Sequence, residues 1–393
     1  MYARFIESIH ELDAASWNRL CPPDYPFVRH EFLAALENSQ CTSANNGWQV
    51  QHLLIYSQDD LVNAQLLAIV PGYIKTHSYG EYVFDWSWAD AYRRYGYAYY
   101  PKWINAIPFT PCVGPRVLCH TDIAQTQLLD FVVQTLHAKC SAENLSGWHS
   151  LFPDNNTSAG FTSGLASITR RLGCQFHWFN RDYRNFDDFV ATMSSRKRKN
   201  ILKERRQVLQ QGFEFEVKTA DQLTAQDWDV FYALYRNTYL KRSGHTGYLN
   251  AEFFQQLGAT MSSNLVLINA SVDQENGARN VIAASLFVRD QNTLYGRYWG
   301  CFEEYQFLHF ETCYYQGIDY AIANGLTRFD GGAQGEHKIA RGFEPVITYS
   351  HHWLKAPQFR NAIDQFIAEE ALAIQHYADE VRDALPFKQR EEQ

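Results

Sequence analysis

The sequence lacks the patterns that mark several common protein classes. None of the eight cysteines forms a C-x-x-C pair, and their scatter is typical of reduced, buried thiols in a cytoplasmic protein. No H-E-x-x-H occurs, and the neighbours His351 and His352 would point to opposite faces of a strand, so we predict no metal site. The absence of G-x-S-x-G disfavours the common serine-hydrolase elbow.

Long apolar runs are also missing. No stretch approaches the ~18–20 apolar residues of a membrane-spanning helix. The first residues, MYARFIESIHELDAASW, show no basic region followed by an apolar core, so they do not read as a signal peptide. We therefore expect a cytoplasmic protein with no membrane span.

The composition is that of a globular protein with a large core. Of the 393 residues, 46% are apolar and 20% are charged, which favours two domains with substantial buried surface. The net charge of −8 disfavours a surface that binds nucleic acid as a whole, although a local basic patch stays open.

The two halves of the chain show the same order of predicted elements. Each half predicts a strand hairpin, a strand with Tyr-Gly-x-Tyr (79–82 and 295–298) and then an aromatic helical segment. We expect two α/β units, 1–181 and 182–393, each with a sheet of its own, although so slight an identity leaves coincidence open. The second unit would carry a basic helix over 195–211 and a C-terminal amphipathic helix over 358–385. At the end of the first unit, LASITRRLGCQFHWFN predicts a helix that stops at Gly173 and is followed by a strand.

Aromatic residues gather between Tyr79 and Trp103, where eleven occur. They could stack on sugar rings or fill a core, and the core is the favoured interpretation because aromatic side chains bury the most area.

A glycine-rich stretch, TRFDGGAQGEHKIARGFEPV, follows a predicted buried strand at 326–330. Its three closely spaced glycines predict positive φ or a close approach of ligand at one or more of Gly331, Gly332 and Gly335. Ligands of open α/β sheets bind beyond the carboxyl ends of strands, where neighbouring strands part. A loop that directly follows such a strand is therefore a candidate to line a cleft.

The helix over 195–211 is strongly basic. It carries seven cations and a single acid, Glu204. The cations are Arg196, Lys197, Arg198, Lys199, Lys203, Arg205 and Arg206. Such a face either meets phosphates of a ligand or is simply solvated, and both interpretations stay open.

These segments resemble a known family. The basic helix with its following strand and the stretch RFDGGAQGEHKIARGFEPV look like Fem-type peptidoglycan aminoacyltransferases. More narrowly, SYGEYVFDWSWADAYRRYG and RYWGCFEEYQFLHFETCYYQGIDYAI are similar to the FemAB-like peptidoglycan biosynthesis/recognition family of the GNAT-type N-acyltransferase superfamily. The resemblance covers nearly the whole chain. It implies a tandem GNAT fold, with mixed sheets flanked by helices, and an N-acyltransferase. In such a fold the fourth and fifth strands part, here 293–300 and 326–330, which would place 331–338 at the mouth of a cleft.

Transfer of an acyl group to an amine needs a base and a donor that stabilises the oxyanion. Glu336 and His337 are the candidate bases, and the resemblance gives Lys338 a place facing the substrate cleft. The alternative is a solvated polar turn. The candidate substrate-binding residues are Gly331, Gly332, Gln334, Arg297, Tyr298, Asp85, Trp86, His309, Arg196 and Lys199.

The acyl donor is the open question. A standard GNAT protein has a glycine-rich pyrophosphate loop after its fourth strand, but residues 300–306 here hold one glycine and the carboxylates Glu303 and Glu304. We expect no tightly bound cofactor, and the donor is either aminoacyl-tRNA, held in part by the basic helix, or acyl-CoA. The acceptor would be the amine of a cell-wall precursor, a peptide or a small metabolite. A non-catalytic protein that recognises peptidoglycan precursors and a CoA-dependent N-acetyltransferase are the alternatives.

Overall fold

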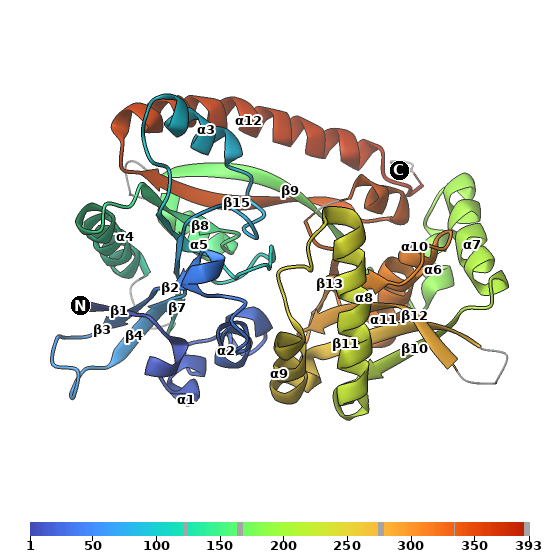
Figure 1. Ribbon diagram of the computed structural model, residues 1–393. Helices are drawn as coiled ribbons and strands as arrows, with labels where there is room; N and C mark the ends of the chain where they lie inside the picture. The colour runs from blue at the N-terminus through green and yellow to red at the C-terminus, as the bar shows by residue number, and fades with distance from the viewer. Residues whose placement is uncertain (121–124, 163–167, 274–278, 334, 389–393) are drawn as a thin grey trace. The chain divides into compact units, whose positions relative to one another are not determined.

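The computed structural model describes residues 1–120, 125–162, 168–273, 279–333 and 335–388 (Figure 1). The chain forms two compact units. The first comprises Met1–Cys174 and Ile347–Tyr377, and the second comprises Gln175–Val346 and Ala378–Gln393. The domain boundary at 181/182 stays a prediction, whereas the compact units divide at 174/175 and residues 347–377 belong to the first unit.

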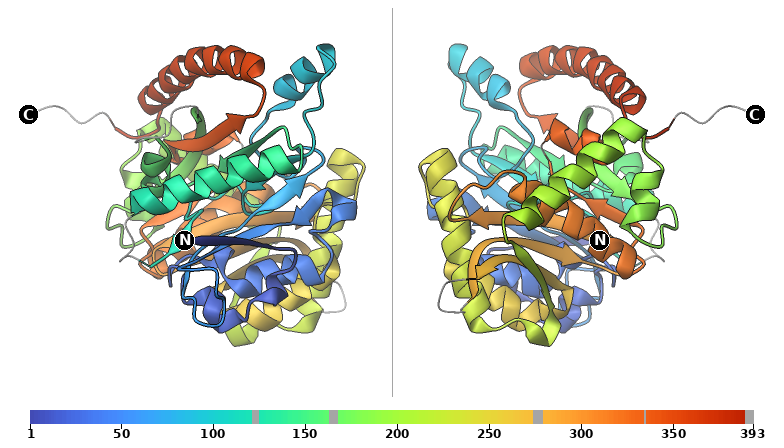
Figure 2. Two further views of the ribbon diagram at one scale, coloured as in Figure 1. Left: turned by 90° about the vertical axis from the view of Figure 1, so that its left-hand side faces the viewer. Right: turned by 90° about the vertical axis from the view of Figure 1, so that its right-hand side faces the viewer.

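The first unit is built on two groups of strands. One sheet has the order β1-β3-β4-β7, and the larger sheet includes β15-β8-β6-β5-β2. The strands are β1 (Tyr2–Ile6), β2 (Trp48–Val50), β3 (His52–Tyr56), β4 (Leu66–Val70), β5 (Tyr73–Lys75), β6 (Lys102–Asn105), β7 (Leu118–Cys119) and β8 (Gly147–Leu151). The helices are α1 (Ala14–Asn18), α2 (His30–Asn38), α3 (Trp86–Arg94), α4 (Gln125–Ala142) and α5 (Asn155–Thr162). Figure 2 shows α4 lying across this unit's strands, where its apolar face packs on Trp103 and Trp148.

The second unit contributes the order β10-β11-β12-β13-β14-β9. Its strands are β10 (Glu214–Thr219), β11 (Leu265–Asp273), β12 (Arg279–Arg289), β13 (Thr293–Cys301) and β14 (Arg328–Asp330). Its helices are α6 (Phe186–Ala191), α7 (Ser195–Gln210), α8 (Ala225–Ser243), α9 (Ala251–Met261), α10 (Leu308–Phe310) and α11 (Gln316–Ala323). Three elements cross the boundary of the units, β9 (Thr169–Phe179), β15 (Glu344–Leu354) and α12 (Pro357–Asp383).

Both units repeat one topology. In the second unit, β10 to β13 pair antiparallel in sequence order, and β13 then pairs parallel with β14. In the first unit, β5 pairs antiparallel with β6, and β6 pairs parallel with β8. Each unit thus changes to a parallel pair after antiparallel strands, and in the second unit this is the place where the strands are expected to part.

The expectation of two separate sheets is wrong. A single hydrogen-bonded order of eleven strands runs through β9 and β15. The reason is local: after β8 and after β14 the chain enters a strand of eleven residues that is not confined to one unit.

Several local expectations are tested by the elements. The helices predicted over 195–211 and 358–385 are found as α7 and α12. The helix predicted before Gly173 is wrong in its described part, because β9 already begins at Thr169. Among the described residues, no helix is both long and apolar enough to cross a bilayer.

Two glycines let helices of the second unit approach its sheet. A Cβ at Gly300 of β13 would lie 2.3 Å from the backbone of Leu234 in α8. A Cβ at Gly317 of α11 would lie 2.7 Å from the ring of Phe329 in β14. Real Cβ contacts do not come so close, so both positions require glycine for the observed packing.

Candidate active site at the parting of β13 and β14

The candidate site lies in the second unit, where β13 leaves β14. The two strands pair only from Thr293 opposite Arg328 to Tyr295 opposite Asp330, whereas β13 continues to Cys301. A cavity of about 130 Å³ opens there. It is lined by Ser285, Leu286, Phe287, Gly296, Arg297, Tyr298, Trp299, His309, Cys313, Tyr314, Phe329 and Gly331. The sequence-based expectation that these strands part is therefore confirmed.

A β-bulge shapes one wall of the cavity. Leu286 of β12 pairs with Tyr298, but the next residue, Phe287, pairs with Gly296, so Arg297 is an extra residue in β13. Bulges re-aim side chains and are frequent beside active sites. Arg297 and Tyr298, both predicted to bind substrate, line the cavity.

A π-helical turn shapes a further part of the wall. It spans Glu311–Tyr315, between α10 and α11, and contributes Cys313 and Tyr314 to the cavity lining. The Cys313 Sγ and the Ser285 Oγ lie 3.0 Å apart, and burial raises the pKa of this thiol to about 12. Cys313 is therefore a protonated wall residue rather than a nucleophile.

Tyr314, which lines the cavity, makes a polar contact with His337 of the glycine-rich stretch. The Tyr314 hydroxyl lies 2.9 Å from His337 Nε2, and the ring of His309 packs edge-on against Tyr314. Desolvation, Lys338 and Arg341 lower the pKa of His337 to about 4. Burial, followed by the charge of neighbouring groups, lowers the pKa of His309 to about 3. Both imidazoles are neutral at pH 7 and can accept a proton or a hydrogen bond.

Lys338 lies behind the glycine-rich loop and is not among the residues that line the cavity. Its side chain is buried, with 1% of the residue exposed, and Nζ donates to the carbonyl oxygen of Gly332 over 2.8 Å. Its Cδ and Cε lie 3.2–3.3 Å from the point that a Cβ of Gly331 would occupy. Burial lowers the pKa of Lys338 to about 8, against the attraction of Asp330.

Asp330, which the sequence reasoning did not single out, joins this loop to β9. Asp330 Oδ1 accepts the N–H of Gly332 over 2.8 Å and lies 3.6 Å from Nε2 of His177. Burial opposes its charge, but His177 and the Gly332 amide together hold the pKa of Asp330 below its ordinary value. No spacing in the sequence reveals a partner so distant; only the register of β14 against β9 brings His177 opposite Asp330.

The structure of the rest of the loop agrees in part with the prediction from the sequence. Gly332 and Gly335 have φ of 82° and 117°, as predicted for the glycines of this stretch. Glu336 is exposed, and the predicted substrate-binding residue Gln334 lies outside the described residues. Arg341, which was not predicted, donates to the carbonyl oxygen of His337 over 2.8 Å and to Glu204 over 2.7 Å, so it fixes the His337 backbone to α7.

The basic helix α7 divides into two parts. Arg205 turns inward and forms ion pairs with Glu311 and Asp319, at 2.9 Å and 2.7 Å. Arg196, Lys199, Lys203 and Arg206 are exposed and have no ion pair or hydrogen bond to the described part of the chain. Their spacing of three and four residues places these four on one face of the helix, and none of them lines the cavity.

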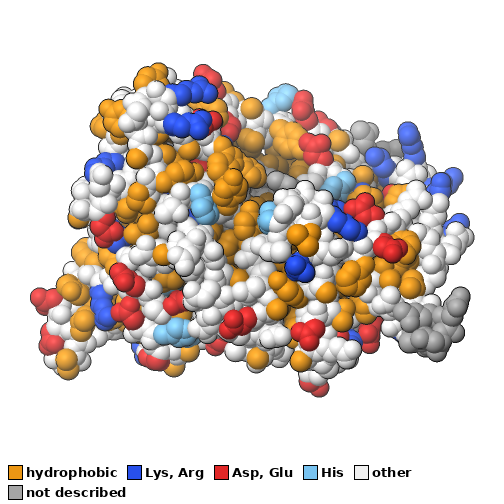
Figure 3. All heavy atoms as spheres, viewed as in Figure 1, with side chains coloured by type: hydrophobic (Ala, Val, Ile, Leu, Met, Phe, Trp, Pro, Cys, Tyr) orange, Lys and Arg blue, Asp and Glu red, His pale blue; other side chains and the backbone are white. Residues whose placement is uncertain are grey.

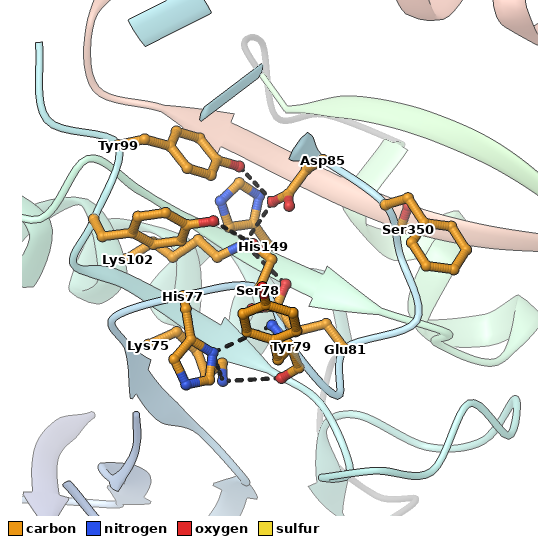
Figure 4. Close-up of polar contacts among 12 residues, drawn as sticks. Lys75, His77, Ser78, Tyr79, Glu81, Asp85, Tyr99, Lys102, His149 and Ser350 are labelled. Carbon is orange, nitrogen blue, oxygen red and sulfur yellow. Dashed lines mark hydrogen bonds and ion pairs between the residues drawn. The ribbon is translucent and has the colours of Figure 1, made fainter. Parts of the chain in front are cut away.

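Asp85 and Trp86, also predicted to bind substrate, belong to the first unit and do not line this cavity. Asp85 is buried and accepts hydrogen bonds from Lys102 and Tyr99, as Figure 4 shows, whereas Trp86 is exposed at the start of α3.

A family model described as peptidoglycan biosynthesis/recognition matches residues 8–389. The chain belongs to the FemAB-like family. No curated protein sequence matches it.

Solved structures with the same fold support the architecture of this FemAB-like protein. A crystal structure of FemX matches with a TM-score of 0.54 and 10% identity, covering 93% of this chain and 100% of that chain. The C-terminal domain of a putative lysylphosphatidylglycerol synthetase from Agrobacterium fabrum matches with a TM-score of 0.53 and 8% identity, covering 91% and 96%. A protein of unknown function from Bacteroides thetaiotaomicron matches with a TM-score of 0.50 and 12% identity, covering 90% and 100%. The predicted tandem GNAT-type α/β fold is confirmed.

The junction after β13 differs from a phosphate-binding loop. Glu303 and Glu304 are exposed there, and α10 has only three residues. The carbonyl oxygen of Phe302 accepts a hydrogen bond from Nζ of Lys241. The N–H of Phe302 donates to the carbonyl oxygen of Ile282. The FemAB-like chain therefore presents carboxylates where a standard GNAT protein presents amides to pyrophosphate.

Proposed function

We propose that this protein is an N-acyltransferase that moves an acyl or aminoacyl group to an amine of a cell-wall precursor, a peptide or a small metabolite. Membership of the FemAB-like family supports a role in peptidoglycan chemistry, and the proposed location is the cytoplasm. The observation that carries the proposal is the cavity between β13 and β14, lined by Arg297, Tyr298, His309 and Tyr314.

In the proposed reaction, the amine nitrogen attacks the acyl carbonyl and forms the new C–N bond. The ester or thioester bond to the donor then breaks, and the leaving oxygen or sulfur takes up a proton. Tyr314 and His337 offer a path for the proton that the amine loses, since the hydroxyl and Nε2 are within hydrogen-bond distance. The low pKa of His337 makes it a weak base, suited to relaying a proton rather than to holding one.

Negative charge develops on the carbonyl oxygen during this attack. Arg297 lines the cavity and carries a permanent positive charge, so it is the candidate for direct stabilisation. We propose that Lys338 acts mainly as a positioning residue, because its ammonium holds the carbonyl oxygen of Gly332, the residue next to the cavity-lining Gly331.

For the donor, we propose aminoacyl-tRNA rather than acetyl-CoA. Glu303 and Glu304 disfavour pyrophosphate after β13, and four unpaired cations on α7 are available for phosphates. Four residues of the first turns of α7 are cationic, and the helix dipole disfavours cations at the N-terminal end of a helix.

A transfer assay tests the proposal. The protein is incubated with UDP-N-acetylmuramoyl-pentapeptide bearing a free lysine amine, and with either unfractionated aminoacyl-tRNA or acetyl-CoA. Mass spectrometry of the pentapeptide should show a gain of one aminoacyl residue with aminoacyl-tRNA only. A gain of one acetyl group alone would overturn the donor assignment. Binding of the precursor without any mass gain from either donor would establish the alternative, a recognition protein.

A further inference from the structure

The segment between Tyr79 and Tyr97 of the first unit carries an unusual amount of exposed aromatic surface. Among the described residues, fifteen large hydrophobic side chains are exposed, and five of them lie in this segment. We call these five the aromatic rim; their exposed fractions are between 40% and 75%. They are Tyr79, Phe84, Trp86, Tyr95 and Tyr97. The expectation that this cluster is core therefore holds only for its other members, such as Trp88, Tyr92 and Trp103.

The backbone that carries the rim is firmly held. Lys102 is buried beneath it and donates to Ser78 and Glu81 over 2.9 Å and 2.8 Å, and also to Asp85, the residue before α3 (Figure 4). Arg171, itself paired with Glu370, donates to the carbonyl oxygen of Phe84 over 2.8 Å. Below α3, Trp88 and Tyr92 pack in a core with Phe359. These contacts hold the backbone of the segment in place while the side chains of the aromatic rim stay exposed.

The same contacts remove negative charge from this surface. Of the three acids in the segment, Glu81 and Asp85 turn inward to Lys102, and Asp90 pairs with Arg93 over 2.8 Å. Arg94 is exposed and has no hydrogen bond or ion pair to the described part of the chain. Lys75 faces the segment from β5, but it is buried as well. The exposed charge of the segment is therefore positive, although the whole chain carries −8.

We propose that the aromatic rim, together with Arg93 and Arg94, docks on the surface of an anionic lipid bilayer. Trp and Tyr rings favour the level of the headgroups, where one end of the ring is apolar and the other is wet. Arginines beside them attract the acidic headgroups. Figure 3 shows hydrophobic side chains beside basic and acidic ones on the face of the first unit that carries α3.

A glycan is the other ligand that exposed aromatic rings attract, and the segment fits it less well. Tyr79 and Trp86 are 4.9 Å apart but inclined by 57°, so they do not form one flat platform for a sugar ring. A sugar site also needs side chains that bond to hydroxyl groups. The segment from Tyr79 to Tyr97 contains no Asn or Gln, and all three of its acids are engaged in ion pairs.

Co-sedimentation with vesicles tests the proposal. The full-length protein is mixed with vesicles of phosphatidylcholine alone or with about one third phosphatidylglycerol. We compare the wild type with Phe84→Ser/Tyr95→Ser, and with a control, Val62→Ser/Leu372→Ser, which removes two other exposed apolar side chains elsewhere in the first unit. Matching melting temperatures confirm that the variants are folded.

The wild type and the control should bind the anionic vesicles equally, and Phe84→Ser/Tyr95→Ser should lower the partition coefficient by roughly tenfold or more. An Arg93→Gln/Arg94→Gln variant should lose a similar factor on anionic vesicles and nothing on neutral ones, because each surface arginine contributes about 1 kcal/mol. Equal losses in the rim variant and the control, no binding of the wild type, or a soluble chito-oligosaccharide binding at the rim while vesicles do not, would each overturn the proposal.

Discussion

The ammonium of Lys338 lies 2.8 Å from the carbonyl oxygen of Gly332, and the amide of Gly332 lies 2.8 Å from Oδ1 of Asp330. One glycine is therefore held by two buried charged side chains through its two backbone polar groups. Because Gly331 next to it lines the cavity, these bonds fix the position of the cavity wall.

Replacing Lys338 with Met should slow transfer by about two orders of magnitude or more if the wall must stay in place for the oxyanion to be stabilised. It should also lower the free energy of unfolding by about 1–3 kcal/mol, because the Gly332 carbonyl loses its partner in a buried place. Steady-state kinetics and urea unfolding measure the two effects. A variant with wild-type turnover would show that Lys338 has no role in the reaction.

The stability contributed at Lys338 should depend on pH. Its pKa is lowered from the ordinary ~10.4 of lysine to about 8 in the folded protein. Between these values the unfolded chain binds more protons than the folded one, so stability rises with pH in this window. The free energy of unfolding of the wild type minus that of Lys338→Met should therefore increase from about pH 8 to pH 10. A difference that stays constant or falls would contradict the burial of the ammonium.

Tyr314→Phe should remove the proton path and leave the cavity shape unchanged. We expect kcat to fall by roughly tenfold to a hundredfold, the lower range for a positioned proton-transfer group, with little change in KM. Tyr320→Phe of α11 is the matched control, because the Tyr320 hydroxyl accepts from Arg289 of β12 and Tyr320 does not line the cavity. Equal effects of the two substitutions, or an effect on KM alone, would contradict the assignment.

Lys102→Met should destabilise the first unit by about 3–5 kcal/mol, since it leaves Glu81 and Asp85 buried without their cation. Burial already raises the pKa of Glu81 to about 7. Burial also opposes the charge of Asp85, but Lys102 lowers its pKa to about 2, so loss of Lys102 should raise both carboxyl pKa values. Protonation then removes the buried charges, so the destabilisation should be smaller at pH 5 than at pH 8. Arg93→Met, which breaks an exposed pair, should cost at most about 1 kcal/mol at either pH.

Replacing Arg196, Lys199 and Lys203 with Ala should weaken the binding of unfractionated tRNA and flatten its salt dependence. Each lost phosphate contact should lower the slope of log K against log salt by about one unit. Arg19→Ala/Arg236→Ala removes exposed, unpaired cations outside α7 and should leave the slope unchanged. Filter-binding titrations at several salt concentrations decide between a phosphate-binding face and a solvated one.

The sequence predicted the place of the site better than its contents. Periodicity and the glycines after Asp330 located the two strands and the loop, and the resemblance to the GNAT fold supplied the expectation that β13 and β14 part. The capping box predicted from Thr224 and Asp227 at the start of α8 is likewise found.

The partners of the site residues were not predictable in the same way. Whether Lys338 faces a cleft or a buried carbonyl depends on how the loop folds back, and the pair of Asp330 and His177 depends on strand register between distant segments. The aromatic segment was predicted to be core because area burial is the default for such residues. The inward turn of Glu81 and Asp85 toward Lys102, which leaves the rim exposed, has no signature in the sequence.

The most direct test of the proposed site is a crystal structure of the protein with a stable amide analogue of the aminoacyl-adenosine end of tRNA. The account predicts that the aminoacyl group occupies the cavity between β13 and β14, with its carbonyl oxygen toward Arg297 and its carbonyl carbon within reach of Tyr314. An analogue bound at any other place on the chain, or an empty cavity at a saturating concentration, would contradict it.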